Sequence, residues 1–367
     1  MDLDFLRPLY DGTGGYVSVY LDTSRDHENA AHEIEVRWAD ARERLASAGA
    51  DAATLDVLGA AFADPEGGTP GRAAFGRGGR VLLTEGLPAV PRREIARLAP
   101  LPHVMPLLAQ RAPRVPHLRV TARHDGGEVV TVSAAGTSAE EEVIGTGWPV
   151  HKVSSGGWSQ LRYQRSTEEA WETNAKELAE RITAESGRIG AELILLAGDP
   201  VARSLVQRQL GSGLAARTVL IEHEVPAESD AAGRAATQAI ADYVAQRSRE
   251  RFEHWRNQQA HGHGVAGLPA TMAALRDGAV AELLLADHPE STDTAWIGPS
   301  GTDLAVSAAE LADRGVTNPV TDRADAALAR ALATTSAQLY FLPGPEADEA
   351  GPDGGICALL RFPDSQA

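Results

Sequence analysis

A segment rich in glycine and arginine, SSGGWSQLRYQR, combines groups that proteins use to bind RNA. Arg162 and Arg165 are three residues apart, so on a helix both guanidinium groups would face the same way and could bind phosphates as a pair. Trp158 could stack on a nucleobase, an interaction worth about 1–3 kcal/mol. Gly156 and Gly157 lack Cβ atoms, which lets another large molecule approach the backbone closely. This tip segment, residues 154–165, therefore predicts a surface for contact with RNA.

The tip segment can also be explained as a glycine-rich connection into a helix. In that alternative Trp158 packs into a core and Ser159 caps the helix. Ser166 could be the cap instead, with Glu169 completing a capping box, and residues 156–165 would then form a loop. The sequence leaves these interpretations open. In the RNA-binding interpretation, the candidate residues are the nearest lysine and selected residues of the segment: Lys152, Gly156, Gly157, Trp158, Ser159, Arg162 and Arg165.

Other patterns in the sequence do not favour a cofactor or a metal ion. The chain has no Gly-x-Gly-x-x-Gly loop that opens a helix after a strand, and no Gly-Lys-Ser/Thr phosphate loop. His261 and His263 stand together without a cysteine or carboxylate at zinc-like spacing. A Gly-x-Ser-x-Gly nucleophile elbow is missing too. We therefore expect neither a cofactor nor a metal.

The charge balance of the chain argues against general binding to nucleic acids. Its 367 residues carry a formal net charge of −17, whereas nonspecific binding depends on positive charge that meets phosphate. Two stretches without acidic residues, 110–124 and 151–165, interrupt this acidic background. We interpret the first as solvated surface and the second as the candidate RNA contact, so any RNA binding should be local.

The composition also predicts a cytoplasmic protein with no membrane partner. No apolar run approaches the roughly 18 residues that span a bilayer. The N-terminus, MDLDFLRPLYDG, carries acids where a secretory signal needs basic residues. The single cysteine, Cys357, lies in the apolar run ICALL and fits a core position in a reducing compartment.

The candidate residues need domains to position them, and the chain is long enough for two or three. Residues 98–116 contain five prolines and indicate a linker, and the sequence HGHG at 261–264 indicates a hinge. We therefore predict three domains: an N-terminal α/β domain at 1–110, a middle domain with the tip segment at 115–262, and a C-terminal α/β domain at 266–367.

Strand and helix patterns alternate along the chain, which favours α/β domains with mixed sheets. Near the N-terminus we expect a strand at 16–21, a helix at 29–48, a loop connection at 64–79 and a strand at 80–84. Residues 124–127, with the sequence HDGG, predict a hairpin turn. After the tip segment, a long helix is indicated by apolar residues at helical spacing, namely Trp171, Ala175, Leu178 and Ile182.

Several motifs resemble one protein superfamily. The sequence GGWSQLRYQR, followed by a helix with Asn174, resembles the Gly-Gly-Gln-Ser-x-x-Arg-Phe-x-Arg tip in the middle domain of archaeal and eukaryotic class I release factors. Residues 354–362 and 277–285 are similar to strands that end and open the third domain of those factors. The stretch YVSVYLDTSRD is similar to the N-terminal domain of the bacterial branch, which includes release-factor-like proteins and Balon-type relatives of Pelota. The match covers about residues 115–362, and the tip is its most specific part.

This resemblance implies a three-domain protein that enters the ribosomal A site, in ribosome hibernation under stress or in ribosome rescue. The first domain would lie toward the decoding centre. The middle-domain tip would contact ribosomal RNA and the tRNA end near the peptidyl-transferase centre. The third domain would face a translational GTPase such as elongation factor Tu. The first block lacks an Asn-Ile-Lys-Ser motif, so reading of stop codons is not implied.

The tip differs from that of release factors at the position that matters for hydrolysis. Release factors have a glutamine there that positions the attacking water, whereas this chain has Trp158, whose indole offers one N–H donor and no acceptor. We therefore favour a binding protein without hydrolytic activity. The alternative is a peptidyl-tRNA ester hydrolase in which Gln160, two residues on, is the catalytic residue. In a third interpretation the protein is a scaffold that does not bind ribosomes, and the tip segment is only a helix entry.

Overall fold

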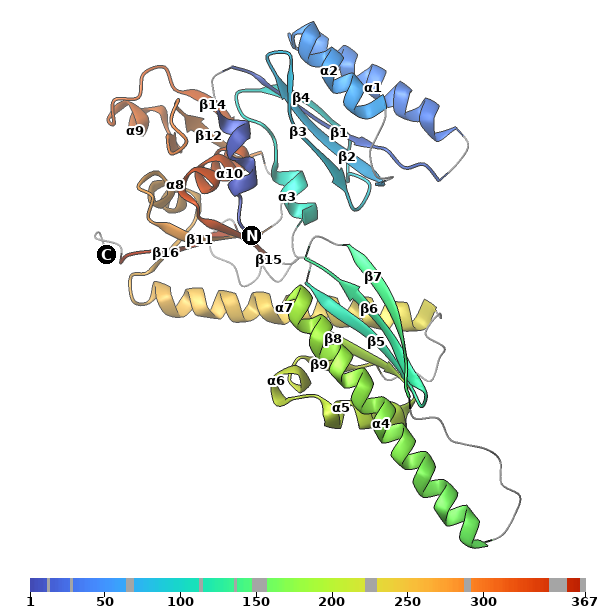
Figure 1. Cartoon of the computed structure of the whole chain (residues 1–367). Helices are drawn as coiled ribbons and strands as arrows, with labels where there is room; N and C mark the ends of the chain where they lie inside the picture. The colour runs from blue at the N-terminus through green and yellow to red at the C-terminus, as the bar shows by residue number, and fades with distance from the viewer. Residues whose placement is uncertain are drawn as a thin grey trace. The chain divides into compact units, whose positions relative to one another are not determined.

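The computed structural model divides the chain into two compact units. Unit 1 contains Met1–Pro113 and Ser248–Ala367, and unit 2 contains Arg114–Arg247. Figure 1 shows their helices and strands. The structure describes residues 1–11, 14–26, 29–63, 69–111, 115–134, 137–146, 157–221, 230–286, 292–342 and 355–363, and among these the side chains of all but 157–166 and 230–232. The boundaries of the three expected domains stay a prediction, but the first and third of them contribute to the same compact unit.

The first part of unit 1 is an antiparallel sheet with strand order β3-β2-β1-β4, covered on one face by two helices. Val17, Val19 and Leu21 alternate along β1 and pack against the helices α1 and α2, as period-two side chains of a strand do. The elements are η1 (Asp4–Tyr10), β1 (Tyr16–Asp22), α1 (Ala30–Ser47), α2 (Ala52–Ala63), β2 (Gly71–Arg77), β3 (Arg80–Leu87), β4 (Ile95–Ala99) and α3 (Met105–Arg111).

The predictions for this part were right for strands β1 and β3 and for helix α1, and wrong for two connections. The expected loop at 64–79 contains strand β2, which pairs with both β1 and β3. The expected linker at 98–116 contains α3, and its Leu101, Val104 and Leu108 are buried. Pro100, Pro102 and Pro106 fit the irregular backbone before α3 and its first turn, so this part of the stretch is not a linker. The boundary between units 1 and 2 falls near the other end of the stretch, between Pro113 and Arg114.

The second part of unit 1 contains a mixed sheet, β10-β16-β11-β15, and a small antiparallel sheet, β13-β12-β14. Strand β11 runs parallel to β15 and antiparallel to β16. The expected hinge at 261–264 is a tight turn that leads directly into β10. The elements are β10 (Gly264–Ala266), α8 (Leu268–Arg276), β11 (Val280–Ala286), β12 (Thr294–Ile297), β13 (Leu304–Ala305), α9 (Ala308–Ala312), β14 (Val320–Arg323), α10 (Ala324–Thr335), β15 (Gln338–Leu342) and β16 (Ile356–Leu360).

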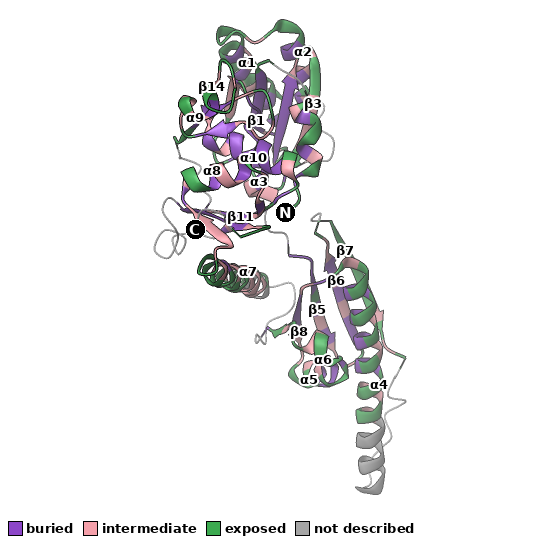
Figure 2. Cartoon of the chain, turned by 90° about the vertical axis from the view of Figure 1, so that its left-hand side faces the viewer, coloured by how far each residue is buried: buried purple, intermediate pink, exposed green. Residues whose placement is uncertain are grey.

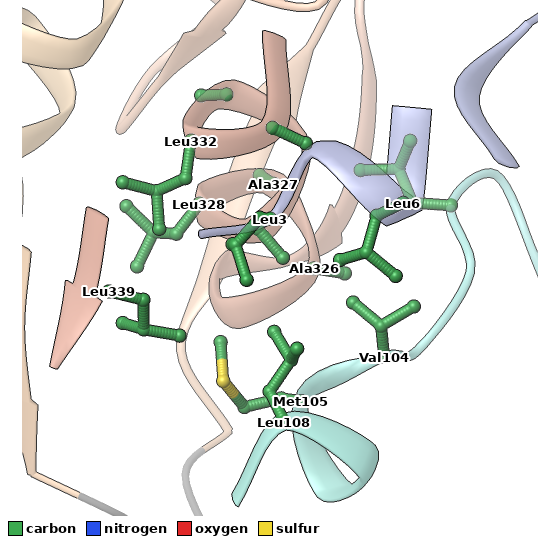
Figure 3. Packing of buried hydrophobic residues seen from close by; sticks show 14 of the residues in the cluster. Leu3, Leu6, Val104, Met105, Leu108, Ala326, Ala327, Leu328, Leu332 and Leu339 are labelled. Carbon is green, nitrogen blue, oxygen red and sulfur yellow. The ribbon is translucent and has the colours of Figure 1, made fainter. Parts of the chain in front are cut away.

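One hydrophobic core joins the two parts of unit 1. Figure 3 shows Leu3, which precedes η1, and Leu6 of η1 between α10 and residues from the α3 region, among them Val104. Helix α10 is buried along most of its length, as Figure 2 shows by its purple colour. In addition, the Leu339 N–H of β15 donates a hydrogen bond of 2.9 Å to the Met1 carbonyl. The N-terminal segment is therefore part of the core formed with residues more than 300 positions later.

Two aspartates reinforce this junction. The fully buried carboxylate of Asp322 pairs with Arg97 and accepts a hydrogen bond of 2.7 Å from the Leu101 N–H. Asp325 lies 3.6 Å from His103 Nε2 and 2.6 Å from Arg323 Nη2. Burial alone would raise the pKa of Asp325, but hydrogen bonds from His103 and Arg323 outweigh burial and lower that pKa to about 2.

We expect unit 1 to lose stability as the pH falls from about 4 toward about 2. The folded-state pKa of Asp325 lies below its ordinary value of 3.8, so its stabilisation is complete above the ordinary value and is lost as the pH falls through the folded one. The change amounts to roughly 2 kcal/mol. Urea unfolding at pH 5 and pH 2 would measure it. Asp325→Asn should remove most of this pH dependence. If the free energy of unfolding fell by the same amount between pH 5 and pH 2 in the variant and the unmodified protein, the prediction would be contradicted.

Unit 2 is a five-stranded mixed sheet, β7-β6-β5-β8-β9, with helices on both faces. Strands β7, β6 and β5 are antiparallel, and β5, β8 and β9 are parallel. Helices α4 and α5 pack on one face and the first part of α7 on the other. The elements are β5 (His117–Arg123), β6 (Gly126–Val132), β7 (Ser138–Ile144), α4 (Gly157–Ile189), β8 (Leu193–Gly198), α5 (Pro200–Gln209), α6 (Ser212–Ala215), β9 (Thr218–Leu220) and α7 (Asp230–Gln259). The predicted mixed α/β fold is confirmed, and so is the hairpin turn between β5 and β6.

Candidate nucleic-acid interface

Helix α4 is much longer than the sheet that supports it. It has 33 residues, which corresponds to about 50 Å, whereas the seven-residue strands β5 and β6 span about 23 Å. Among the described side chains, Trp171 is the first of α4 to contact the hydrophobic core of unit 2. The 14 residues 157–170 precede it and cover about 21 Å of helix. Figure 1 shows α4 continuing past the ends of the strands.

The candidate residues of the sequence lie at the start of this helix. Lys152 and Gly156 lie outside the described residues. The other five candidates and Gln160 lie in the first two and a half turns of α4, where only the backbone is described: Gly157, Trp158, Ser159, Gln160, Arg162 and Arg165. Because the helix begins at Gly157, neither Ser159 nor Ser166 is its cap, and the interpretation of 156–165 as a loop is wrong from Gly157 onward.

The helical backbone sorts these positions onto two faces. Positions 158, 162 and 165 follow the spacing i, i+4 and i+7, so Trp158, Arg162 and Arg165 occupy one stripe of α4. Gln160 is two residues from Trp158, a rotation of about 200° around the helix axis. Three of the candidate RNA-binding positions, those of Trp158, Arg162 and Arg165, are therefore together, whereas Gly157 and Ser159 lie about 100° to either side of Trp158. The candidate catalytic position, that of Gln160, is on the face opposite the stripe.

The first turns of α4 are also a favourable place for an anion. The start of a helix carries a partial positive charge and N–H groups without intrahelical partners, both of which favour phosphate. Arginines occur in these turns, while acidic residues follow only from Glu168, with Glu168, Glu169 and Glu172 all exposed. Charge thus changes sign along the helix, with the basic end farther from the core.

The core-facing side of α4 fixes the helix on the sheet. The predicted stripe of Trp171, Ala175, Leu178 and Ile182 is confirmed, because the last three are buried against the sheet and Trp171 packs against the same core. Figure 2 shows strands β5 and β6 coloured mainly as buried beside α4. Farther along the helix, Arg181 forms an ion pair with Glu141 of the edge strand β7. The supported half of α4 thus holds the projecting half in a defined direction within unit 2.

Polar contacts add to this support where α4 passes the β5–β6 turn. The buried Asn174 donates a hydrogen bond of 2.9 Å from Nδ2 to the carbonyl oxygen of His124. A Cβ at Gly145 would lie only 2.1 Å from Asn174 Oδ1, so glycine makes the close approach of this segment possible. Next to it, Glu177 of α4 accepts hydrogen bonds from the side chain and backbone N–H of Thr146, which lower the pKa of Glu177.

A second group of contacts, which the sequence did not reveal, lies at the carboxyl ends of β5 and β8. The ring of His124 stacks on Trp171 with 3.8 Å between centroids, and His124 Nε2 lies 3.3 Å from Asp199 Oδ1. Asp199 also caps α5 through hydrogen bonds from the N–H groups of Val201 and Ala202. The Asp-Pro pair at the end of an apolar strand is a cap signal that could have identified Asp199. No sequence pattern indicated its pairing with His124.

The other basic stretch, residues 110–124, agrees with solvated surface where it is described. Arg123 forms ion pairs with Asp125 and Glu142, and Arg119 is exposed. Burial would lower the pKa of Arg123, but the hydrogen bonds to the two carboxylates outweigh it and raise that pKa.

The part of the chain that the structure describes offers neither a cluster of metal ligands nor a membrane-spanning helix. No group of three or more metal-ligating side chains is present among these residues. No helix formed by them is both long enough and apolar enough to cross a membrane. The buried Cys357 is unpaired there, and burial raises the pKa of its thiol to about 12.

Comparison with known proteins assigns the middle of the chain to a described family. Residues 116–261 match the model of the bacterial archaeo-eukaryotic release factor family 2. The chain is also 30% identical, over 97% of its length and 96% of theirs, to uncharacterized proteins from two strains of Mycobacterium tuberculosis.

Similar solved structures come from archaea and yeast. A model of ribosome-bound archaeal Pelota and ABCE1 is 14% identical, with a TM-score of 0.40, over 98% of this chain and 94% of that one. Dom34 of S. cerevisiae, described as a translation termination-like factor, is 10% identical, with a TM-score of 0.39, over 74% of this chain and 75% of that one. An archaeal translation termination factor, aRF1, is 14% identical, with a TM-score of 0.25, over 96% and 93%. The family model and the near full-length relatives together show that the chain belongs to the bacterial archaeo-eukaryotic release factor family 2.

Proposed function

We propose that this protein binds the A site of the ribosome and directs the start of α4 toward the peptidyl-transferase centre, in ribosome hibernation or rescue. The observation that carries the proposal is the projecting half of α4. It extends about 21 Å beyond the first core contact and brings the positions of Trp158, Arg162 and Arg165 onto one stripe. Membership of a release factor family supports the ribosome as the target.

The physical basis of this binding would be a few strong contacts on an acidic protein. Two arginines on one stripe can contact neighbouring phosphates, and a tryptophan on the same stripe can stack on an unpaired base. The net charge of −17 disfavours contacts elsewhere on RNA. Binding would then be selective, because the attraction to RNA phosphates would be concentrated at the tip. A translational GTPase such as elongation factor Tu is the partner we propose for the C-terminal part.

We further propose that this binding does not cleave peptidyl-tRNA. Trp158 stands where release factors of the resembled family have glutamine. Position 160 is rotated by about 200° from position 158 on α4, so it lies on the helix face opposite the Trp158 stripe. A hydrolase based on Gln160 would therefore require the first turns of α4 to unwind.

Replacing both arginines, Arg162→Ala and Arg165→Ala, should weaken binding to purified 70S ribosomes and flatten its dependence on salt. Each lost phosphate contact should reduce the slope of log affinity against log salt by about 1, so the double variant should lose about 2. Cosedimentation across a salt series would measure both quantities. A matched control is the double variant Arg208→Ala and Arg234→Ala, which removes the same charge from exposed helical positions of unit 2.

The outcomes separate the three interpretations of the sequence. Loss of binding in the Arg162/Arg165 variant but not in the control would support the proposal. Failure of the unmodified protein to sediment with ribosomes would reject it and favour the scaffold. Cleavage of labelled peptidyl-tRNA in the same samples, abolished by Gln160→Ala, would establish the hydrolase instead.

A further inference from the structure

Unit 1 contains a cleft of about 1030 Å³, whereas the tip segment belongs to unit 2. Its walls come from η1, the start of β1, the end of β4, the loop after β12 and helix α10. Sites for drug-sized ligands typically occupy about 300–1000 Å³. The cleft is thus large enough for an organic molecule and much larger than a single inorganic ion needs.

A buried arginine in one wall lacks an anionic partner. Arg330 of α10 is only 6% exposed, and it donates hydrogen bonds of 3.0 and 2.9 Å to the carbonyl oxygens of Gly298 and Asp303. It forms no ion pair with a carboxylate of the described residues, and its Nε finds no hydrogen-bond partner among them. Burial lowers the pKa of Arg330, and the nearby carboxylates of Asp303 and Asp322 offset only part of that effect.

Two further groups in or beside the wall favour an anion. The hydroxyl of Tyr10 is buried and finds no hydrogen-bond partner in the described part of the chain, although the charge of Arg330 reaches it. Arg77 lies beside Tyr16, with its guanidinium carbon 4.6 Å from the ring centroid and Nη1 2.6 Å from the Tyr16 hydroxyl. Arg77 also donates to the Asp11 carbonyl and forms no ion pair with a described carboxylate. Its hydrogen bonds thus go to neutral oxygens, as those of Arg330 do.

Part of the remaining wall is apolar, while Arg7, Asp11, Thr317 and Thr334 also line the cleft. Leu98, Leu101 and Ile297 line the cleft together with the ring of Tyr16. At its edge is Asn318, an exposed residue in left-handed conformation with φ of 53°, whose side chain makes no hydrogen bond to the described residues. A ligand that suits the whole cleft would combine an anionic head with an apolar or flat body.

We propose that this cleft binds a small organic oxyanion, either a phosphate or a carboxylate, with its head near Arg330 and Tyr10 and its body against Leu98 and Ile297. The anion would neutralise Arg330 and give the Tyr10 hydroxyl an acceptor. Because the cleft lies in unit 1, this site is independent of the tip segment, and neither proposal depends on the other.

Isothermal titration calorimetry on the full chain tests the site with four probes: adenosine 5′-monophosphate, adenosine, inorganic phosphate and citrate. Adenosine 5′-monophosphate supplies both an anionic head and a flat body, and adenosine supplies the body alone. Inorganic phosphate supplies the phosphate head alone, and citrate supplies carboxylates. We expect adenosine 5′-monophosphate to bind at least about 10-fold more tightly than adenosine, because hydrogen bonds to a charged group are strong. Tighter binding of citrate than of either phosphate would identify the head as a carboxylate.

Two variants report on the cleft without removing a hydrogen bond that the described structure makes. Tyr10→Phe deletes only the unpartnered hydroxyl and should weaken binding by about 10-fold. Asn318→Asp adds a negative charge at the edge and should weaken it by roughly 5-fold, an effect that salt should reduce. Their controls are Tyr243→Phe in unit 2 and Asn257→Asp at an exposed position of α7, which should leave affinity unchanged.

The proposal fails if none of the three anionic probes gives saturable binding, or if both cleft variants bind as the unmodified protein does. Equal affinity for adenosine and its monophosphate would also overturn it, because the head would then contribute nothing. Equal affinity for inorganic phosphate and the monophosphate would reject the assignment of the apolar walls to the ligand body. Circular dichroism of each variant would confirm that it is folded.

Discussion

Asp322→Ala should lower the free energy of unfolding of unit 1 by roughly 3–5 kcal/mol, the range for removing one partner of a buried ion pair. The Asp322 carboxylate is fully buried, and its loss leaves Arg97 without its charge partner and the Leu101 N–H without an acceptor. Because Arg97 and Leu101 belong to the first part of unit 1 and Asp322 to the second, the loss acts directly on their junction. Urea unfolding, with hydrogen exchange of the peptides containing β4 and β14, would measure it.

Two further variants make this prediction specific. Asp322→Asn keeps an oxygen that can accept from the Leu101 N–H but loses the charge, so it should cost less than alanine. Asp313→Ala removes a carboxylate at an exposed position and should change stability by no more than about 0.5 kcal/mol. If Asp322→Ala were as mild as Asp313→Ala, the ion pair would have no part in holding unit 1 together.

Gly198→Ala should destabilise unit 2 by roughly 3 kcal/mol, through backbone strain and displacement of paired strands. Gly198 ends β8 with φ of 105°, a conformation that residues with a Cβ rarely adopt. An added Cβ would also lie 2.1 Å from the carbonyl oxygen and 2.7 Å from the nitrogen of Ala122 on β5. Neither backbone atom can move without breaking the pairing of β5 with β8.

The damage should extend to the support of α4, because Asp199 follows directly and lies beside His124, which stacks on Trp171. Hydrogen exchange should therefore increase in β5, β8 and the middle of α4, and ribosome binding should fall with it. Gly187→Ala is the matched control. Gly187 lies within α4 with no atom near its added Cβ, so alanine there should stabilise the helix by about 0.5–1 kcal/mol. Equal stability of the two variants would contradict the strain at Gly198.

Local sequence patterns were sufficient to predict the elements whose buried side chains recur at the regular spacing of a strand or a helix. Strand β1 and the stripe of α4 from Trp171 to Ile182 were predicted because their apolar spacing is set by the elements themselves. The sequence did not decide whether the tip segment is helical. Its two glycines lower helix propensity, and more than one polar residue could have been the N-cap of the helix.

What the sequence could not predict depends on partners distant in the chain. Residues 98–116 look like a linker by their prolines, but Leu101 and Val104 are buried by contacts with η1 and α10. The pairing of Arg97 with Asp322 joins residues 225 positions apart, and nothing in either local sequence indicates it. The same holds for Arg330, which is unremarkable in sequence and becomes a candidate binding residue only through the cleft that it lines.

Unit 1 is built from two separate segments of the chain, and this affects how the protein folds during synthesis. During synthesis, Leu3, Leu6 and the apolar side of α3 leave the ribosome long before α10 and β15, against which they pack. At about 5–20 residues per second, this delay lasts roughly 10–70 s. Unit 2 can be completed during that interval, whereas the N-terminal part waits with apolar surface uncovered. The nascent chain should therefore need a chaperone for its first hundred or so residues, and slow translation of the last third should lower the yield of folded protein.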